Sequence, residues 1–240
     1  MENKLDKDLL SSLEVSINRM GTALRVQSER WFEMPQKILI DENDAITNLE
    51  NSFDSVLETC HSVDDSLRKL KIINEQNSSV RFLNLIRNIR HHNSSKLPYS
   101  LTKSVLQESW SGEWYTHPLK INEEISETNM LIPIEITNFF EITSGYIDNG
   151  RLKQKHLDSI VSDFSLGNFL QSIKNDNAQV VLDINPVLIS SLSYLFKVIK
   201  SNNLHLKLLD DADTYLSHFC SMETVVILKP KIYLPKRYNN

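Results

Sequence analysis

The chain has 240 residues, a formal net charge of -5, and 40% hydrophobic and 24% charged residues. This composition is ordinary for a globular protein and too apolar for a disordered one. The acidic balance argues against a non-specific nucleic-acid coat protein, which would carry a basic excess, but it leaves room for a local basic site. Only five glycines occur, with no GxGxxG or GxxxxGK[ST] sequence, so glycine-rich phosphate loops are not expected.

Three further features of the sequence bear on the cellular compartment. Cys60 and Cys220 show neither a CxxC spacing nor a nearby pair of histidines, which favours reduced thiols over a disulfide or a zinc site. The N-terminal sequence is acidic and amphipathic rather than basic and then apolar, so no signal peptide is expected. No stretch has the continuous apolar length of a membrane span. We therefore expect a cytoplasmic protein without a membrane partner.

The first half of the chain has the apolar periodicity of helices, with an apolar residue every three or four positions. The helical segments cover residues 5–32, 45–73 and 77–92. Pro35 is expected to end the first, and Gly21 is its weak point. The acidic cluster 41–44 suits the start of the second. Two long helices followed by a shorter buried one predict an up-and-down helical bundle over residues 1–100.

The second half mixes patterns, so we predict a mainly α protein with an α+β C-terminal half, residues 101–240. This half is either separate or packed as one unit with the first. Residues 98–130 are expected to form loops and short helices. Asn149-Gly150 predicts a hairpin turn, and Pro133 should keep its strand at a sheet edge. The predicted strands are 130–136, 180–184, 204–208 and 224–234, and the predicted helices are 157–173 and 186–200.

The stretch Arg87-Asn88-Ile89-Arg90-His91-His92 closes the third helical segment and carries the clearest chemistry in the chain. RNA is cleaved without a metal when its own 2′-hydroxyl attacks the adjacent phosphate. The reaction needs a proton carrier, for which histidine is suited near neutral pH. It also needs fixed positive charge on the phosphate, which arginine supplies. Asn88 is suited to holding the substrate or the catalytic ring.

This stretch resembles the R-[polar]-x-x-x-H motif of the HEPN superfamily, whose helical domains occur in toxin–antitoxin, abortive-infection and anti-phage systems. The resemblance implies a metal-independent endoribonuclease without a cofactor, acting on single-stranded RNA through a composite site in a homodimer. It assigns catalytic roles to Arg87, Asn88 and His92, with His91 as a substitute at a shorter spacing. It covers six residues, with helical context over roughly residues 1–100. The tyrosine that accompanies some HEPN toxins is replaced by Ser94, which argues against a nucleotidyltransferase antitoxin.

Helical geometry constrains this site. At about 100° per residue, Arg87 and His91 lie about 40° apart, whereas Arg87 and His92 lie about 140° apart. Either the helix frays at 91–93, or a partner protomer supplies one of the groups. The same cluster also suits a helix C-terminal cap, because cations favour the last turn.

We expect five other basic residues to bind RNA: Arg81, Arg90, Arg68, Lys69 and Lys71. A buried arginine needs either an acidic partner or an anionic ligand. The C-terminal basic run, the aromatic residues around His117 and the acidic pairs at 123–124 and 210–211 are interpreted as solvated or packing residues, and no metal site is expected. The alternative function is a non-catalytic interaction or regulatory subunit of a defence or toxin–antitoxin complex, with a protein partner.

Overall fold

The computed structural model describes residues 4–75, 77–92, 132–167, 179–222 and 230–233. Within these ranges it has seven helices and three strands, which confirms a mainly helical protein with a small sheet. The chain forms two compact units, Met1–His92 with Pro186–Ile227 and Asn93–Asn185 with Leu228–Asn240. This division differs from the expected boundary near residue 100, because the apolar helix after Pro186 belongs to the same unit as the N-terminal helices.

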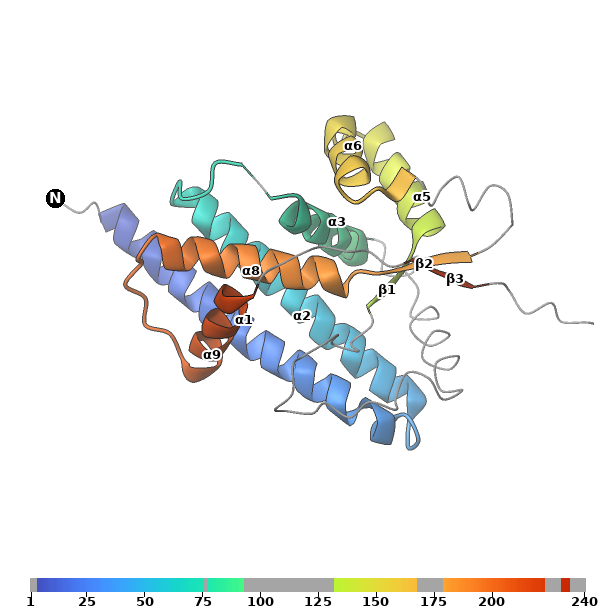
Figure 1. The fold of residues 1–240 in the computed structure, drawn as a ribbon, viewed down its shortest axis with the longest axis horizontal. Helices are drawn as coiled ribbons and strands as arrows, with labels where there is room; N and C mark the ends of the chain where they lie inside the picture. Colours follow the sequence, from blue (N-terminus) through green and yellow to red (C-terminus); the bar gives the residue numbers. More distant parts are fainter. Residues whose placement is uncertain (1–3, 76, 93–131, 168–178, 223–229, 234–240) are drawn as a thin grey trace, which may run out of the picture. The chain divides into compact units, whose positions relative to one another are not determined.

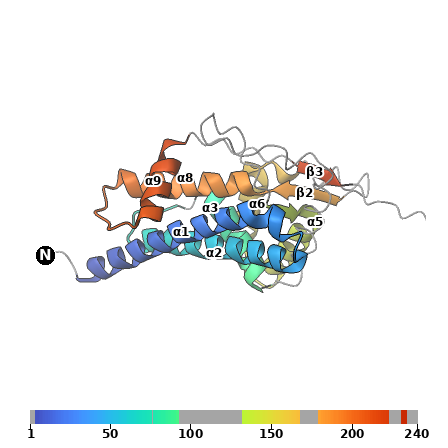
Figure 2. The ribbon, with the colours of Figure 1, turned by 90° about the horizontal axis from the view of Figure 1, so that it is seen from below.

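The first unit is built on a helical hairpin of α1 (Lys4–Lys37) and α2 (Glu42–Lys69), which lie side by side in Figure 2. Asp41 caps α2 by accepting a hydrogen bond of 3.0 Å from the Asp44 backbone N–H, as the acidic cluster predicted. The expectation that α1 ends at Pro35 was wrong. Proline lacks a donor, but α1 continues to Lys37, and the Ile38 N–H still reaches the Met34 carbonyl at 3.0 Å.

The third helix, α3 (Ser78–His92), matches the predicted segment. The Asn77 side chain accepts from the Ser79 N–H at 2.9 Å, so Asn77 helps to start the helix. Helix α2 ends at Lys69, earlier than the expected Ile73, because Lys71 takes a left-handed conformation with φ 58°. The α2–α3 connection is therefore short, and α3 returns along α2.

Two more helices complete the first unit (Figure 1). Helix α8 (Asn185–Ser201) confirms the predicted helix and packs on α9 (Asp210–Ser221) through the stacked rings of Phe196 and Phe219. The predicted strand over 204–208 is absent. The Asn18 side chain of α1 instead bonds the backbone of Lys207 and Leu209 at 3.1 and 2.8 Å, so this segment has no need of a sheet partner.

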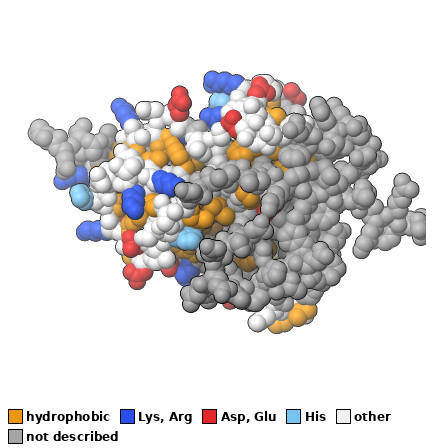
Figure 3. Space-filling model, in the orientation of Figure 1, with side chains coloured by type: hydrophobic (Ala, Val, Ile, Leu, Met, Phe, Trp, Pro, Cys, Tyr) orange, Lys and Arg blue, Asp and Glu red, His pale blue; other side chains and the backbone are white. Residues whose placement is uncertain are grey.

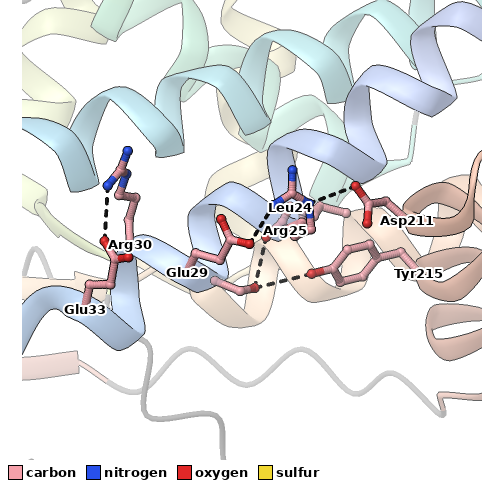
Figure 4. A network of polar contacts seen from close by, with 8 residues as sticks. Leu24, Arg25, Glu29, Arg30, Glu33, Asp211 and Tyr215 are labelled. Carbon is pink, nitrogen blue, oxygen red and sulfur yellow. Dashed lines mark hydrogen bonds and ion pairs between the residues drawn. The ribbon is translucent and has the colours of Figure 1, made fainter.

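Helix α9 differs from the sequence prediction, which gives no helix here and expects its acidic residues to form a solvated face. Its three aspartates occupy the first turn, where negative charge favours the helix. Figure 4 shows how α9 is tied to α1: Arg25 bonds Asp211 at 2.9 Å, and Tyr215 lies 3.4 Å from the Ser28 hydroxyl. Gly21 permits this contact, because a Cβ built there would lie 2.6 Å from the Ala212 Cα.

The second unit contains an antiparallel sheet in the order β1-β2-β3, formed by Pro133–Glu135, Gln179–Asp183 and Pro230–Tyr233. Among the described strands β1 is at the edge, as Pro133 predicted. The strand is shorter than expected, since α5 (Ile136–Asp148) begins at Ile136. The predicted hairpin at Asn149-Gly150 was wrong. Gly150, with φ 74°, ends α5, and the Arg151 N–H bonds the Tyr146 carbonyl at 2.8 Å.

Helix α6 (Gln154–Asp163) covers the start of the predicted helix over 157–173, whose end lies outside the described residues. Residues 98–130 and most of the C-terminal basic run also lie outside them. The core of the first unit is apolar and comes from all of its helices. Its fully buried side chains include Leu13, Ile17, Met20, Ile46, Leu57, Leu67, Phe82, Ile86, Ile89 and Phe196.

Candidate functional site

The motif residues lie in the last two turns of α3, which stays helical through His92. The fraying considered for His91 and His92 is therefore not observed. Regular helix geometry keeps Arg87 and His92 about 140° apart around the α3 axis. His91 and His92 are both exposed, and their ring centroids are 4.8 Å apart, edge to face. These imidazoles are accessible to a ligand or a partner.

Arg87 is fixed by an acidic partner on the neighbouring helix. Its Nε and Nη2 donate to the two carboxylate oxygens of Glu58 on α2 at 2.8 and 2.7 Å, and its Nη1 donates to Asn88 Oδ1 at 3.0 Å. The side chain is 23% exposed. The bidentate pair fixes the plane of the guanidinium. Three of the roughly five N–H donors of an arginine are used in these contacts.

Arg90, assigned to RNA binding, is bound more completely by acidic side chains. Its Nη2 and Nε donate to Glu50 and Asp54 of α2, and its guanidinium carbon lies 5.4 Å from the centre of the Phe53 ring. Burial lowers the pKa of Arg90, but the hydrogen bonds and charges of Asp54 and Glu50 outweigh it, so the net pKa is raised. Arg90 is 19% exposed and neutralised. Its position favours a structural role over RNA binding.

A third polar group occupies the next turn along the same pair of helices. Asp64 on α2 is 2% exposed and accepts from Asn84 Nδ2 of α3 at 3.1 Å. Asn84 Oδ1 lies 3.1 Å from Nδ1 of the half-buried His61. Arg68 Nη2 donates to Asp64 Oδ2 at 3.3 Å. Burial, and secondly the charge of Asp64, raise the pKa of Tyr194 on α8, against the opposing charge of Arg68.

These contacts define one feature, the α2–α3 seam. It consists of three successive layers: His61, Asp64 and Asn84; Glu58, Arg87 and Asn88; and Glu50, Asp54 and Arg90. The two helices run antiparallel, because α3 residues that come later in the chain meet α2 residues that come earlier. The seam is a polar strip on an otherwise apolar interface.

The remaining basic residues expected to bind RNA make no contact with Arg87 among the interactions of the described residues. Arg68 and Lys69 follow Glu58 on α2 by at least ten residues. At the rise of an α-helix this places them about 15 Å from Glu58 along the helix axis. They pair with Asp64 and Asp65 on their own helix, and Lys71 is exposed beyond its end. Arg81 is half-buried near the start of α3. In the view of Figure 3, described cationic and anionic side chains are interspersed rather than gathered by sign.

The sequence-based prediction did not include the acidic residues of the α2–α3 seam as site residues. Glu50, Asp54 and Glu58 are spaced at i, i+4 and i+8, which places them on one face of α2. The apolar periodicity of α2 predicts its buried face but does not show which residues its acidic face meets. Three arginines on the next helix were a second signal, since each needed an acidic partner or an anion.

No protein-family model, curated protein or solved structure matches this chain. In the part of the chain that the structure describes, no helix combines the length and apolar character needed to cross a membrane. Across those same ranges, no group of three or more His, Cys, Asp or Glu side chains is arranged to hold a metal ion. His205 and His218 are exposed and lie away from α2 and α3 in the sequence.

Proposed function

We propose that this chain is a metal-independent endoribonuclease of the HEPN type, cleaving single-stranded RNA in the cytoplasm as a toxin or anti-phage effector. The observation that carries the proposal is the orientation of Arg87. Glu58 and Asn88 hold its guanidinium in one plane, one helical turn before two exposed histidines. A fixed cation next to a proton carrier is what phosphodiester cleavage without a metal requires.

Glu58 and an RNA phosphate need not compete for Arg87. The carboxylate occupies the edge formed by Nε and Nη2. The opposite edge, formed by Nη1 and Nη2, has a second pair of N–H groups. Among the described residues, the one further contact of the guanidinium is that of Nη1 with Asn88. A phosphate oxygen approaching this edge would meet an oriented donor. Glu58 is therefore a positioning residue in the proposal.

The proposed active form is a homodimer. Because α3 remains helical, His92 and Arg87 of one protomer face different directions. A composite site built from both protomers lets the His92 of one chain serve the Arg87 of the other. His91, about 6 Å from Arg87 along the helix and on its face, is the alternative histidine within one chain.

The test is cleavage of single-stranded RNA by the full chain in excess chelator. Arg87→Ala and His92→Ala should each lower the rate by about a hundredfold or more. His205→Ala, an exposed histidine outside the seam, is the matched control and should leave the rate unchanged. Mixing the Arg87→Ala and His92→Ala proteins should restore part of the activity, because mixed dimers keep an intact arginine and an intact histidine on opposite protomers.

A non-catalytic interaction module is the second candidate, and one observation favours it. Carboxylates neutralise both Arg87 and Arg90, as expected for a structural ion-pair strip. If this candidate is correct, the unaltered protein leaves RNA intact, and Glu58→Gln changes only the free energy of unfolding or the binding of a protein partner. If the ribonuclease proposal is correct, Glu58→Gln also lowers the cleavage rate.

A further inference from the structure

His61 is held by a chain of hydrogen bonds with a defined direction. An ionised carboxylate only accepts, so Asp64 takes the N–H of the Asn84 amide, at 3.1 Å. The Asn84 carbonyl must then face His61, whose Nδ1 lies 3.1 Å away and has to be the donor. The proton therefore sits on Nδ1, and Nε2 of the neutral ring carries the lone pair. Asp64, 2% exposed, keeps this direction fixed.

An imidazole oriented in this way suits proton transfer. A general base works best when a second group, itself oriented by a third, holds its ring and its tautomer. Here Asn84 is the second group and Asp64 the third.

The layer that contains His61 is next to the layer that contains Arg87, the proposed phosphate ligand. His61 and Glu58 are three residues apart on α2, as are Asn84 and Arg87 on α3, so their layers are about 4.5 Å apart along the helices. Cα–Cβ bonds tilt toward the N-terminus of their own helix. In antiparallel helices this tilt brings His61 toward the Glu58–Arg87 layer from one side and His91 toward it from the other.

We propose that His61 is a second catalytic histidine of the ribonuclease site, with Asn84 and Asp64 as its positioning residues; this inference rests on the proposed function. Nε2 of neutral His61 accepts the proton of the RNA 2′-hydroxyl as that oxygen forms a bond to phosphorus. The bond from phosphorus to the 5′-oxygen breaks, and a protonated histidine at the end of α3 gives its proton to the leaving oxygen. The products are a 2′,3′-cyclic phosphate and a 5′-hydroxyl.

The decisive variant is His61→Asn in the full chain. The asparagine amide N–H can replace Nδ1–H as donor to Asn84, but it offers no proton acceptor in place of Nε2. Single-turnover cleavage in chelator should fall by about a hundredfold or more. The Kd for an RNA with a 2′-deoxy sugar at the cleavage point and the unfolding midpoint should stay near those of the unaltered protein. His205→Ala is again the control.

Each result separates this inference from the proposed function. If the unaltered protein and His61→Asn cleave equally while Arg87→Ala is inactive, the ribonuclease proposal stands and the role of His61 is refuted. If the unaltered protein does not cleave RNA at all, the proposed function fails and the role of His61 fails with it. The ring itself gives an independent check: NMR should show His61 protonated at Nδ1, and an Nε2-protonated ring would overturn the hydrogen-bond direction.

Discussion

Replacing Arg90 by methionine should destabilise the first unit substantially. Methionine keeps an unbranched side chain against Phe53 but removes the guanidinium that neutralises Glu50 and Asp54. Glu50 is 18% exposed and Asp54 45% exposed. The substitution therefore removes the ion pair between Arg90 and a largely buried carboxylate, that of Glu50. Breaking a buried ion pair costs about 3–5 kcal/mol. Because solvent reaches part of this cluster, we expect about 2–4 kcal/mol.

The assay is urea unfolding followed by the helical circular dichroism signal. Lys69→Met is the matched control, because Lys69 pairs with Asp65 on α2 in an exposed bridge, with side chains 60% and 47% accessible. An exposed pair contributes about 0–1 kcal/mol. The double variant Arg90→Met with Glu50→Gln should recover part of the loss, since the buried charge is removed with its partner. A loss for Arg90→Met no larger than for Lys69→Met would refute the account of the seam as a buried ion-pair cluster.

Three further predictions follow from individual positions. Gly21→Ala should lower the free energy of unfolding by about 1–3 kcal/mol, because its Cβ would lie 2.6 Å from the Ala212 backbone; thermal unfolding measures this. Gly145→Ala, with nothing within 4 Å of the added Cβ, should instead raise it by about 1 kcal/mol through helix propensity. Burial, and then the charge of Asp64, raise the pKa of Cys60 from 9.0 to about 12, so only the unfolded state ionises this thiol between those values. Stability should therefore fall above pH 9, by about 1.4 kcal/mol per pH unit, and Cys60→Ala should show a shallower fall in urea unfolding at rising pH.

The sequence predicted the helices whose formation depends on residues close together in the chain. The apolar periods of α1, α2, α3 and α8 and the caps at Asp41 and Asn77 are readable from neighbouring residues, and the structure has them. The sequence-based prediction was wrong where contacts with residues far away in the chain decide the local conformation. Residues 204–208 alternate like a strand, but Asn18 bonds the backbone there from the far end of the sequence.

In the candidate site, too, the sequence predicted the local features but not the contacts between distant residues. The positions of Arg87, Asn88, His91 and His92 at the end of α3 followed from the sequence. The pairing of Arg87 with Glu58 did not, because it depends on the register between two antiparallel helices, which apolar periodicity leaves open. His61 was overlooked for the same reason, since its partner Asn84 is 23 residues away.

The most direct test of the account is the chemical identity of the RNA ends produced by the purified full chain in excess chelator. Attack by the 2′-hydroxyl with Arg87 on the phosphate predicts fragments that end in a 2′,3′-cyclic phosphate and begin with a 5′-hydroxyl. These fragments should be absent with Arg87→Ala and with RNA lacking the 2′-hydroxyl at the cleavage point. Intact RNA, or fragments with 3′-hydroxyl and 5′-phosphate ends, would contradict the account.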